Sequence, residues 1–134
     1  MDAFQPDILV TQLGIDAHRT DPLSHVGISL GAFVQAVRRL KDLCGRWVAL
    51  GGGGYDLRNV ARAWTAAWAI MNDCELPVSL PASFLARHKE IEWDGAAFID
   101  APAISGGTAK ALAWDEVRET VELLKRSVFP RHGI

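Results

Sequence analysis

The sequence has 134 residues, of which 49% are hydrophobic, and a formal net charge of −2 at pH 7. So small a charge gives no long-range attraction to nucleic acid or to an anionic membrane surface, and we expect neither as a partner. No apolar run reaches the length of a membrane span, and the first residues lack the basic and apolar parts of a signal peptide, which predicts a cytoplasmic protein. The hydrophobic share is high for a solitary domain of this size and indicates missing neighbours.

The first part of the chain predicts two strand–loop–helix units. Residues 8–13 have the pattern of a buried strand, residues 16–25 form a polar loop, and a helix follows with Ser29 as its N-cap. Residues 47–50 form a second buried strand, and residues 57–71 keep a helical period. Strands that alternate with helices predict an α/β fold whose parallel strands are covered on both faces. So few helices cannot cover both faces of two strands, so part of the sheet is expected to lack its cover.

The organisation changes near Pro77. Residues 77–107 contain scattered prolines and glycines and predict extended or loop structure, and an amphipathic helix then ends before Pro130. This helix presents one apolar face, formed by Trp114, Val117, Val121, Leu124 and Val128. We therefore assign residues 1–81 to two βα units of an α/β domain, and residues 82–134 to an extended segment plus a final helix of the same domain.

Four consecutive glycines stand between the second strand and its helix: Gly51, Gly52, Gly53 and Gly54. They lead directly to Tyr55, and Asp56 then occupies the expected N-cap position of the helix. Residues without a Cβ adopt positive φ easily and let another group approach the backbone closely. A plain tight turn needs glycine at only one or two positions, so the run predicts a binding pocket at the carboxyl end of this strand.

A polar loop at the end of the first strand contains Asp16, His18 and Asp21. The carboxyl ends of adjacent parallel strands lie at the same edge of a sheet, so Asp16 and Tyr55 are expected to face one crevice. There Asp16 could bind a metal, and the Asp-x-His spacing could give two zinc ligands. Alternatively, Asp16 and Asp21 form Asx turns while His18 bonds a backbone carbonyl.

Several segments resemble the carboxyl-terminal part of the zinc-dependent histone deacetylase superfamily, and within it the bacterial acetoin-utilisation deacetylases. The resemblance extends from Phe4 to Pro81 and, more weakly, to Trp93. Its motifs are residues 4–7, 12–18, 21–23, 47–55 and 59–65. It implies an arginase/deacetylase-like parallel sheet flanked by helices, followed by an irregular segment and a final helix.

The resemblance also implies roles for single residues. The aspartate matching Asp16 is one of three protein ligands to a catalytic zinc, and the tyrosine matching Tyr55 hydrogen-bonds the scissile carbonyl. Zinc activates water for attack, and a phenol supports the developing oxyanion. The position of His18 is not a metal ligand in that family, which leaves His18 and Asp21 as possible supporting residues around the site. The implied substrate is an acetyl-lysine protein or a small acetylated amide.

Two parts of the family's pattern are absent from this sequence: the upstream aspartate-x-histidine segment with the other zinc ligands, and the adjacent histidine pair that supplies the base. We therefore expect little or no zinc in this chain and no activity without a missing amino-terminal half. A first alternative is a non-catalytic remnant that self-associates. A second is a phosphate or nucleotide binder, although the run lacks G-x-G-x-x-G spacing and Asp56 would repel an anion.

Overall fold

The computed structural model describes residues 4–93, 95–100 and 108–133. They belong to two compact units, one of residues 7–103 and one of residues 1–6 and 104–134. The predicted loop at residues 105–107 lies outside the described residues. The expected assignment of residues 1–81 and 82–134 to two parts of one domain stays a prediction.

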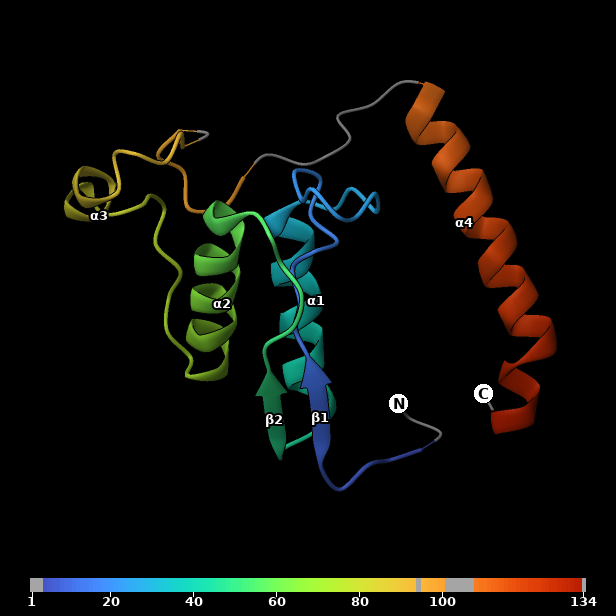
Figure 1. The fold of residues 1–134 in the computed structure, drawn as a ribbon. Coiled ribbons are helices and arrows are strands. Elements are labelled where there is room, and N and C mark those ends of the chain that lie inside the picture. The colour runs from blue at the N-terminus through green and yellow to red at the C-terminus, as the bar shows by residue number, and fades with distance from the viewer. Residues whose placement is uncertain (1–3, 94, 101–107, 134) are drawn as a thin grey trace. The chain divides into compact units, whose positions relative to one another are not determined.

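The larger unit contains two strands and three helices in its described residues (Figure 1). In chain order these are β1 (Leu9–Gln12), α1 (Leu30–Leu43), β2 (Trp47–Leu50), α2 (Leu57–Met71) and α3 (Ala82–Arg87). The two strands pair in parallel, with Leu9 opposite Trp47 and Gln12 opposite Leu50. The predicted α/β class with parallel strands is therefore confirmed.

Both long helices begin at the residues that the sequence predicts. The side chain of Ser29 accepts a hydrogen bond from the backbone N–H of Ala32 at 3.2 Å, which caps α1. The side chain of Asp56 accepts from the backbone N–H of Arg58 at 3.1 Å, which caps α2. Each cap satisfies a backbone donor that has no partner inside its helix. The first residues of α1 and α2 therefore mark the ends of the loops that follow β1 and β2.

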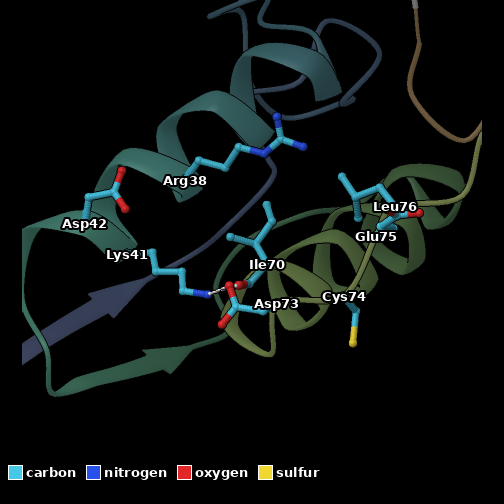
Figure 2. Close-up of a pocket in the computed structure, with 8 residues that line it drawn as sticks. All are labelled: Arg38, Lys41, Asp42, Ile70, Asp73, Cys74, Glu75 and Leu76. Carbon is cyan, nitrogen blue, oxygen red and sulfur yellow. Dashed lines mark hydrogen bonds and ion pairs between the residues drawn. The ribbon is translucent and has the colours of Figure 1, made fainter.

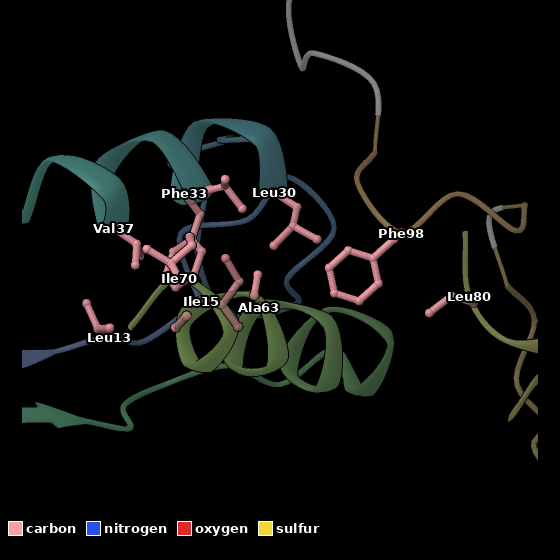
Figure 3. Close-up of a cluster of buried hydrophobic side chains, with 12 residues drawn as sticks. Leu13, Ile15, Leu30, Phe33, Val37, Ala63, Ile70, Leu80 and Phe98 are labelled. Carbon is pink, nitrogen blue, oxygen red and sulfur yellow. The ribbon is translucent and has the colours of Figure 1, made fainter. Parts of the chain in front are cut away.

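The hydrophobic core lies where α1 and α2 pack together and against the loops that follow the strands (Figure 3). Its buried members are Leu13, Ile15, Leu30, Phe33, Val34, Val37, Ala63, Ala66, Ala67, Ile70, Leu80 and Phe98. The last two come from the segment expected to be extended, where Ser79 and Ala97 form an isolated bridge. The short helix α3 interrupts this segment and was not predicted, because six residues are too few to establish a helical period.

One face of the sheet is exposed, as expected for two strands with too few helices to cover both faces. Along each strand, half-buried and exposed residues alternate. Trp47 and Ala49 pack against the core. On the other face Val10, Val48 and Leu50 are 61%, 48% and 53% exposed. Within the described residues, two helices supply one apolar layer, and the outer face of these strands remains apolar and accessible to water.

The smaller unit contains α4 (Thr108–Ser127) and a short 3-10 helix (Phe129–His132). The predicted final helix is confirmed, and its residues Trp114 and Val117 are 58% and 51% exposed. Pro130 lies within the 3-10 helix, beyond the end of α4, as expected for a residue that cannot continue an α-helix. Among the described helices, none combines the length and the hydrophobicity needed to cross a bilayer.

Candidate active site

The glycine run lies against the loop that follows β1. The backbone N–H of Leu13 donates to the carbonyl of Leu50 at 2.8 Å, and that of Ile15 donates to the carbonyl of Gly53 at 2.7 Å. A Cβ at Gly53 would overlap the carboxylate of Asp16. Parallel pairing thus continues beyond the ends of both strands. The glycines allow the loop after β2 to lie close against the loop after β1.

Neighbouring positions in the run are restricted as well, Gly51 less severely than the others. A Cβ at Gly52 would lie 2.6 Å from the backbone N of Gly14, and one at Gly51 would lie 3.0 Å from the ring of Trp64. Gly54 has φ of 147°. A side chain at any of these positions would meet another group or require a strained backbone. Several glycines are therefore needed because neighbouring groups leave little space for side chains along this run.

Asp16 and Tyr55 are placed at the same end of the two strands. Asp16 is half-buried, with its carboxylate against Gly53. Tyr55 is two residues further along the run, and its side chain is 55% exposed. The expected meeting of the two loops at the carboxyl ends of adjacent parallel strands is therefore observed. The chemical roles of the two side chains stay predictions.

Asp21 joins the two loops. Its Oδ1 accepts a hydrogen bond from the backbone N–H of Leu23 at 2.9 Å, and its Oδ2 accepts one from the backbone N–H of Tyr55 at 2.9 Å. The first bond is the expected Asx turn. The second crosses from the β1 loop to the residue that follows the glycine run. Asp21 is 8% exposed, so both bonds lie largely out of water.

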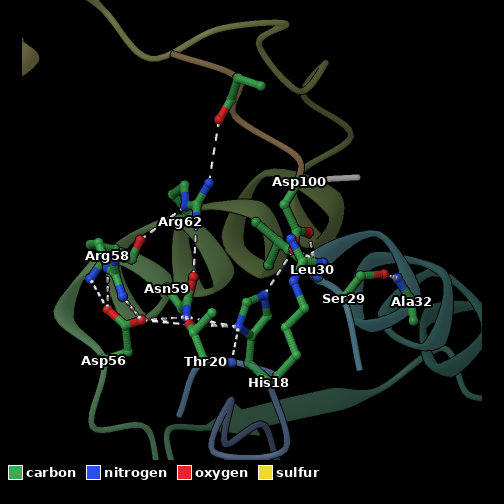
Figure 4. A network of polar contacts seen from close by, with 12 residues as sticks. His18, Thr20, Ser29, Leu30, Ala32, Asp56, Arg58, Asn59, Arg62 and Asp100 are labelled. Atoms are coloured by element: carbon green, nitrogen blue, oxygen red, sulfur yellow. Dashed lines mark hydrogen bonds and ion pairs between the residues drawn. The ribbon is translucent and has the colours of Figure 1, made fainter. Parts of the chain in front are cut away.

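His18 is 2% exposed, and both of its ring nitrogens have partners (Figure 4). Nδ1 lies 3.2 Å from the backbone N of Thr20 and 2.9 Å from Nδ2 of Asn59, which are both donors. Nε2 lies 3.0 Å from Oδ2 of Asp100. Since Nδ1 accepts, the proton belongs on Nε2. The expected bond to a carbonyl is wrong, because a carboxylate takes that place, and no nitrogen is left to bind a metal.

No motif or period in the sequence identifies Asp100 as part of this cluster. Its Oδ2 also pairs with the guanidinium of Arg19 at 2.7 Å, and its Oδ1 accepts from the backbone N–H of Leu30 at 2.7 Å. One carboxylate therefore ties the β1 loop to the first turn of α1. The apolar pair Phe98 and Ile99 was the only local sign that this segment packs against the core.

A second polar cluster surrounds Asp56 (Figure 4). Its carboxylate accepts hydrogen bonds from Thr20 Oγ1 at 2.6 Å, from Asn59 Nδ2 at 3.1 Å and from the guanidinium of Arg58 at 2.7 and 2.8 Å. Burial alone would raise the pKa of Asp56, but the bonds from Arg58 and Thr20 outweigh it and lower the pKa to about 2. Asp56 therefore stays ionised and links the β1 loop to α2.

Residues of α2 complete this cluster as structural members. Arg62 donates to Oδ1 of Asn59 at 2.7 Å, and both side chains are buried. Trp64 donates from its indole N–H to the carbonyl of Leu13 at 3.1 Å. Asn59, Arg62 and Trp64 thus serve packing and local hydrogen bonding. Arg58 and Thr20 were not singled out from the sequence, because their role as hydrogen-bond donors depends on where the Asp56 carboxylate lies in the fold.

The described residues do not form a complete zinc site by themselves. Nowhere in residues 4–93, 95–100 and 108–133 do three His, Cys, Asp or Glu side chains gather in a way that could hold a metal ion. Asp16 offers one oxygen ligand, and the nitrogens of the nearby His18 are occupied. Catalytic zinc sites use three protein ligands. Asp16 fits as one member of such a set.

The concavities on the surface of this unit include three with different linings. Tyr55 lines one of about 420 Å³ together with Pro22, Leu57 and Ile91. An apolar one of about 240 Å³ lies between the end of β2 and the rings of Trp64 and Trp68. A third, of about 630 Å³, lies between α1 and the end of α2, and its mixed lining includes Arg38, Lys41, Asp73 and Leu76 (Figure 2). In this third one, the Lys41 ammonium already donates to the carbonyl of Ile70 and to Asp73.

Comparisons with known proteins agree on one family. The profile of the histone deacetylase domain matches residues 1–71. The chain is 34% identical over 90 residues to the acetoin utilization protein AcuC of Bacillus subtilis, a match that covers 63% of this chain and 23% of AcuC. It is 38% identical over 81 residues to human histone deacetylase 1, covering 60% of this chain and 17% of that protein.

A solved structure extends the similarity to the fold. The crystal structure of an HDAC homolog from Aquifex aeolicus superposes with a TM-score of 0.72 and 30% sequence identity, over 90% of this chain and 34% of that chain. The chain thus spans less than a quarter of the length of the two relatives above and about a third of this structure.

Proposed function

This chain belongs to the histone deacetylase family, and we propose that it supplies the carboxyl-terminal part of a zinc-dependent deacetylase active site. The observation that carries the proposal is the packing of the Asp16 carboxylate against the glycine run that presents Tyr55. A metal ligand and an oxyanion donor must be held at a fixed separation to act on one carbonyl group. Continued pairing of the two loops supports such a separation.

Each of the two side chains has a distinct proposed role. The phenol O–H of Tyr55 donates a hydrogen bond to the oxygen of the acetyl carbonyl, and this bond strengthens as negative charge develops there. Its 55% exposure leaves the hydroxyl accessible to a substrate. Asp16 contributes one of the ligands that hold the family's zinc. The remaining ligands and the base that activates water come from outside this set of residues.

The family acts on acetylated lysine, and we propose the same substrate class here, with small acetylated amides as the other option. The chain by itself is proposed to be inactive and to hold zinc weakly, since Asp16 alone does not satisfy the three-ligand requirement.

Reconstitution tests the proposal. The chain is combined, in trans or as a fusion, with the amino-terminal portion of an AcuC-type deacetylase, and hydrolysis of a fluorogenic acetyl-lysine peptide is measured. We expect activity that Tyr55→Phe lowers by about 100-fold to 1,000-fold, because one oxyanion donor is lost. Asp16→Asn should abolish it, whereas Asp42→Asn, an exposed change on α1, should leave it intact. Full activity of the Tyr55→Phe protein would contradict the assignment.

A second candidate function, self-association, is favoured by the exposed outer face of the sheet. Val10, Val48 and Leu50 form an apolar surface on two paired strands. Such surfaces associate in water. We propose that a chain without its amino-terminal portion dimerises through this face. Light scattering over a range of concentrations tests this; a monomer at every concentration that binds no dye for apolar surface would exclude it.

A further inference from the structure

We propose that Asp21 is a positioning residue that fixes the backbone at Tyr55 relative to the loop that carries Asp16. The geometric part of this inference stands on the hydrogen bonds themselves. Its catalytic consequence rests on the proposed function, because it requires Tyr55 to act as the oxyanion donor.

The backbone pairing between the β1 loop and the glycine run reaches the carbonyl of Gly53, two residues before Tyr55. Glycine has the widest choice of backbone conformations, and Gly54, directly before Tyr55, adopts φ of 147°. Packing does not hold the ring either, since the side chain of Tyr55 is 55% exposed. A residue that follows a permissive backbone and has an exposed side chain needs another constraint if its hydroxyl is to occupy one position.

Asp21 provides that constraint. Each of its carboxylate oxygens accepts one backbone N–H at 2.9 Å: Oδ1 from Leu23, and Oδ2 from Tyr55. The first bond fixes the carboxylate on its own loop, so the second transmits the position of that loop to Tyr55. Hydrogen bonds to an ionised acceptor are stronger than neutral ones, and Asp21 is only 8% exposed.

The residue after Tyr55 is tied to the same loop. Thr20 Oγ1 donates to Asp56 Oδ2 at 2.6 Å, next to the bond between Asp21 and Tyr55. Two successive loop residues therefore hold two successive residues at the start of α2. The tie through Asp56 also caps the helix, whereas the tie through Asp21 acts on the backbone of Tyr55 alone.

Amide hydrogen exchange reports directly on the hydrogen bond from the Tyr55 N–H to Asp21 in this chain. Asp21→Ala removes both acceptors, and we expect the protection of the Tyr55 amide to fall by about 10-fold or more, which corresponds to losing one hydrogen bond to a charged group. Amides inside α1 and α2 should keep their protection. Tyr55 is the single tyrosine in the sequence, so selective labelling also reports whether its ring signal broadens or shifts. Asp42→Asn serves as the control and should change neither signal.

Asp21→Asn distinguishes a specific effect on the backbone of Tyr55 from a general loss of stability. It also replaces Asp21→Ala in the experiment if the alanine variant fails to fold. An asparagine has one acceptor oxygen, so either Tyr55 or Leu23 must lose its acceptor, and one of these two amides should lose protection. Unchanged exchange at both amides in a folded Asp21→Asn protein would overturn the proposal. So would an unprotected Tyr55 amide in the wild-type chain.

The reconstituted enzyme tests the consequence for catalysis. We expect Asp21→Ala to lower kcat with little change in KM, and to have no further effect when Tyr55 is already phenylalanine. A wild-type kcat in Asp21→Ala, despite a deprotected Tyr55 amide, would overturn the positioning role. If the reconstituted wild-type enzyme hydrolyses no acetyl-lysine, the proposed function fails, and the exchange experiment still decides whether Asp21 fixes Tyr55.

Discussion

Two regions of the larger unit differ in how their side chains are satisfied. One is the site end, at the carboxyl ends of β1 and β2, and the other is the outer face of the sheet. At the carboxyl ends of β1 and β2, the polar side chains His18, Asn59 and Arg62 are buried, and among the described residues no buried side-chain nitrogen or oxygen lacks a hydrogen-bond partner. On the outer face of the sheet, Val10 and Val48 are apolar and exposed. A buried polar cluster is stable only when its groups are satisfied. The hydrogen bonds among the described residues therefore suffice to hold the polar cluster at the site end. The sheet face, in contrast, exposes apolar side chains that a partner could cover.

Adding one methyl group at the site end should have the largest effect. Gly53→Ala places a Cβ into the carboxylate of Asp16, so either the loop or Asp16 must move. We expect a loss of about 3 kcal/mol in the free energy of unfolding, the upper range for overpacking. Urea denaturation followed by tryptophan fluorescence measures it.

Gly45→Ala is the matched control for this prediction. A Cβ at Gly45 meets nothing within 4 Å. It should change stability by less than about 0.5 kcal/mol, as surface substitutions usually do. Equal stability losses in the two variants would mean that the contact between the glycine run and Asp16 is not tight.

Acid should weaken the site end through Asp56. Its pKa is about 2 in the folded chain against an ordinary 3.8, so the ionised form stabilises the fold. This contribution, at most about 2 kcal/mol once solvent screening is allowed for, is complete above about pH 5 and is lost as the pH falls through about 2. Asp56→Asn keeps a capping residue but lacks the charge.

The stability difference between wild type and Asp56→Asn should therefore shrink between pH 5 and pH 2. Urea midpoints at both pH values measure it. A difference that does not depend on pH would show that the bonds from Thr20 and Arg58 do not favour the ionised carboxylate.

The smallest effect on stability is expected at the sheet face. Val48→Lys changes a residue that is 48% exposed, so the free energy of unfolding of the monomer should change by no more than about 0.5 kcal/mol. Its effect on association should be large, since a charge would be buried in the contact. Light scattering should give a lower mass for Val48→Lys than for Ala36→Lys, an exposed change on α1. Equal masses would place any association elsewhere.

Local signals in the sequence predicted the frame of the fold correctly. Helical period and capping residues gave the starts of α1 and α2, and the apolar run at residues 47–50 gave β2. The meeting of the two loops followed from parallel strands ending at one edge. These predictions succeeded because each depends on residues close together in the chain or on a general property of parallel sheets.

Long-range contacts could not be predicted in the same way. Asp100 is 82 residues from His18 and 70 from Leu30, and no period or motif connects them. The bond from Tyr55 to Asp21 also depends on how two loops pack. Exposure of one sheet face was expected from the small number of helices, but which residues form that face depends on how the strands pack against α1 and α2.

The central claim is that this chain contributes Asp16 and Tyr55 to a deacetylase site that it does not complete. The most direct test is the zinc content of the chain after purification without chelator, measured together with hydrolysis of a fluorogenic acetyl-lysine peptide. We predict much less than one zinc per chain and no turnover. Stoichiometric zinc with turnover that depends on Tyr55 would contradict the account, because this chain would then hold a complete catalytic site.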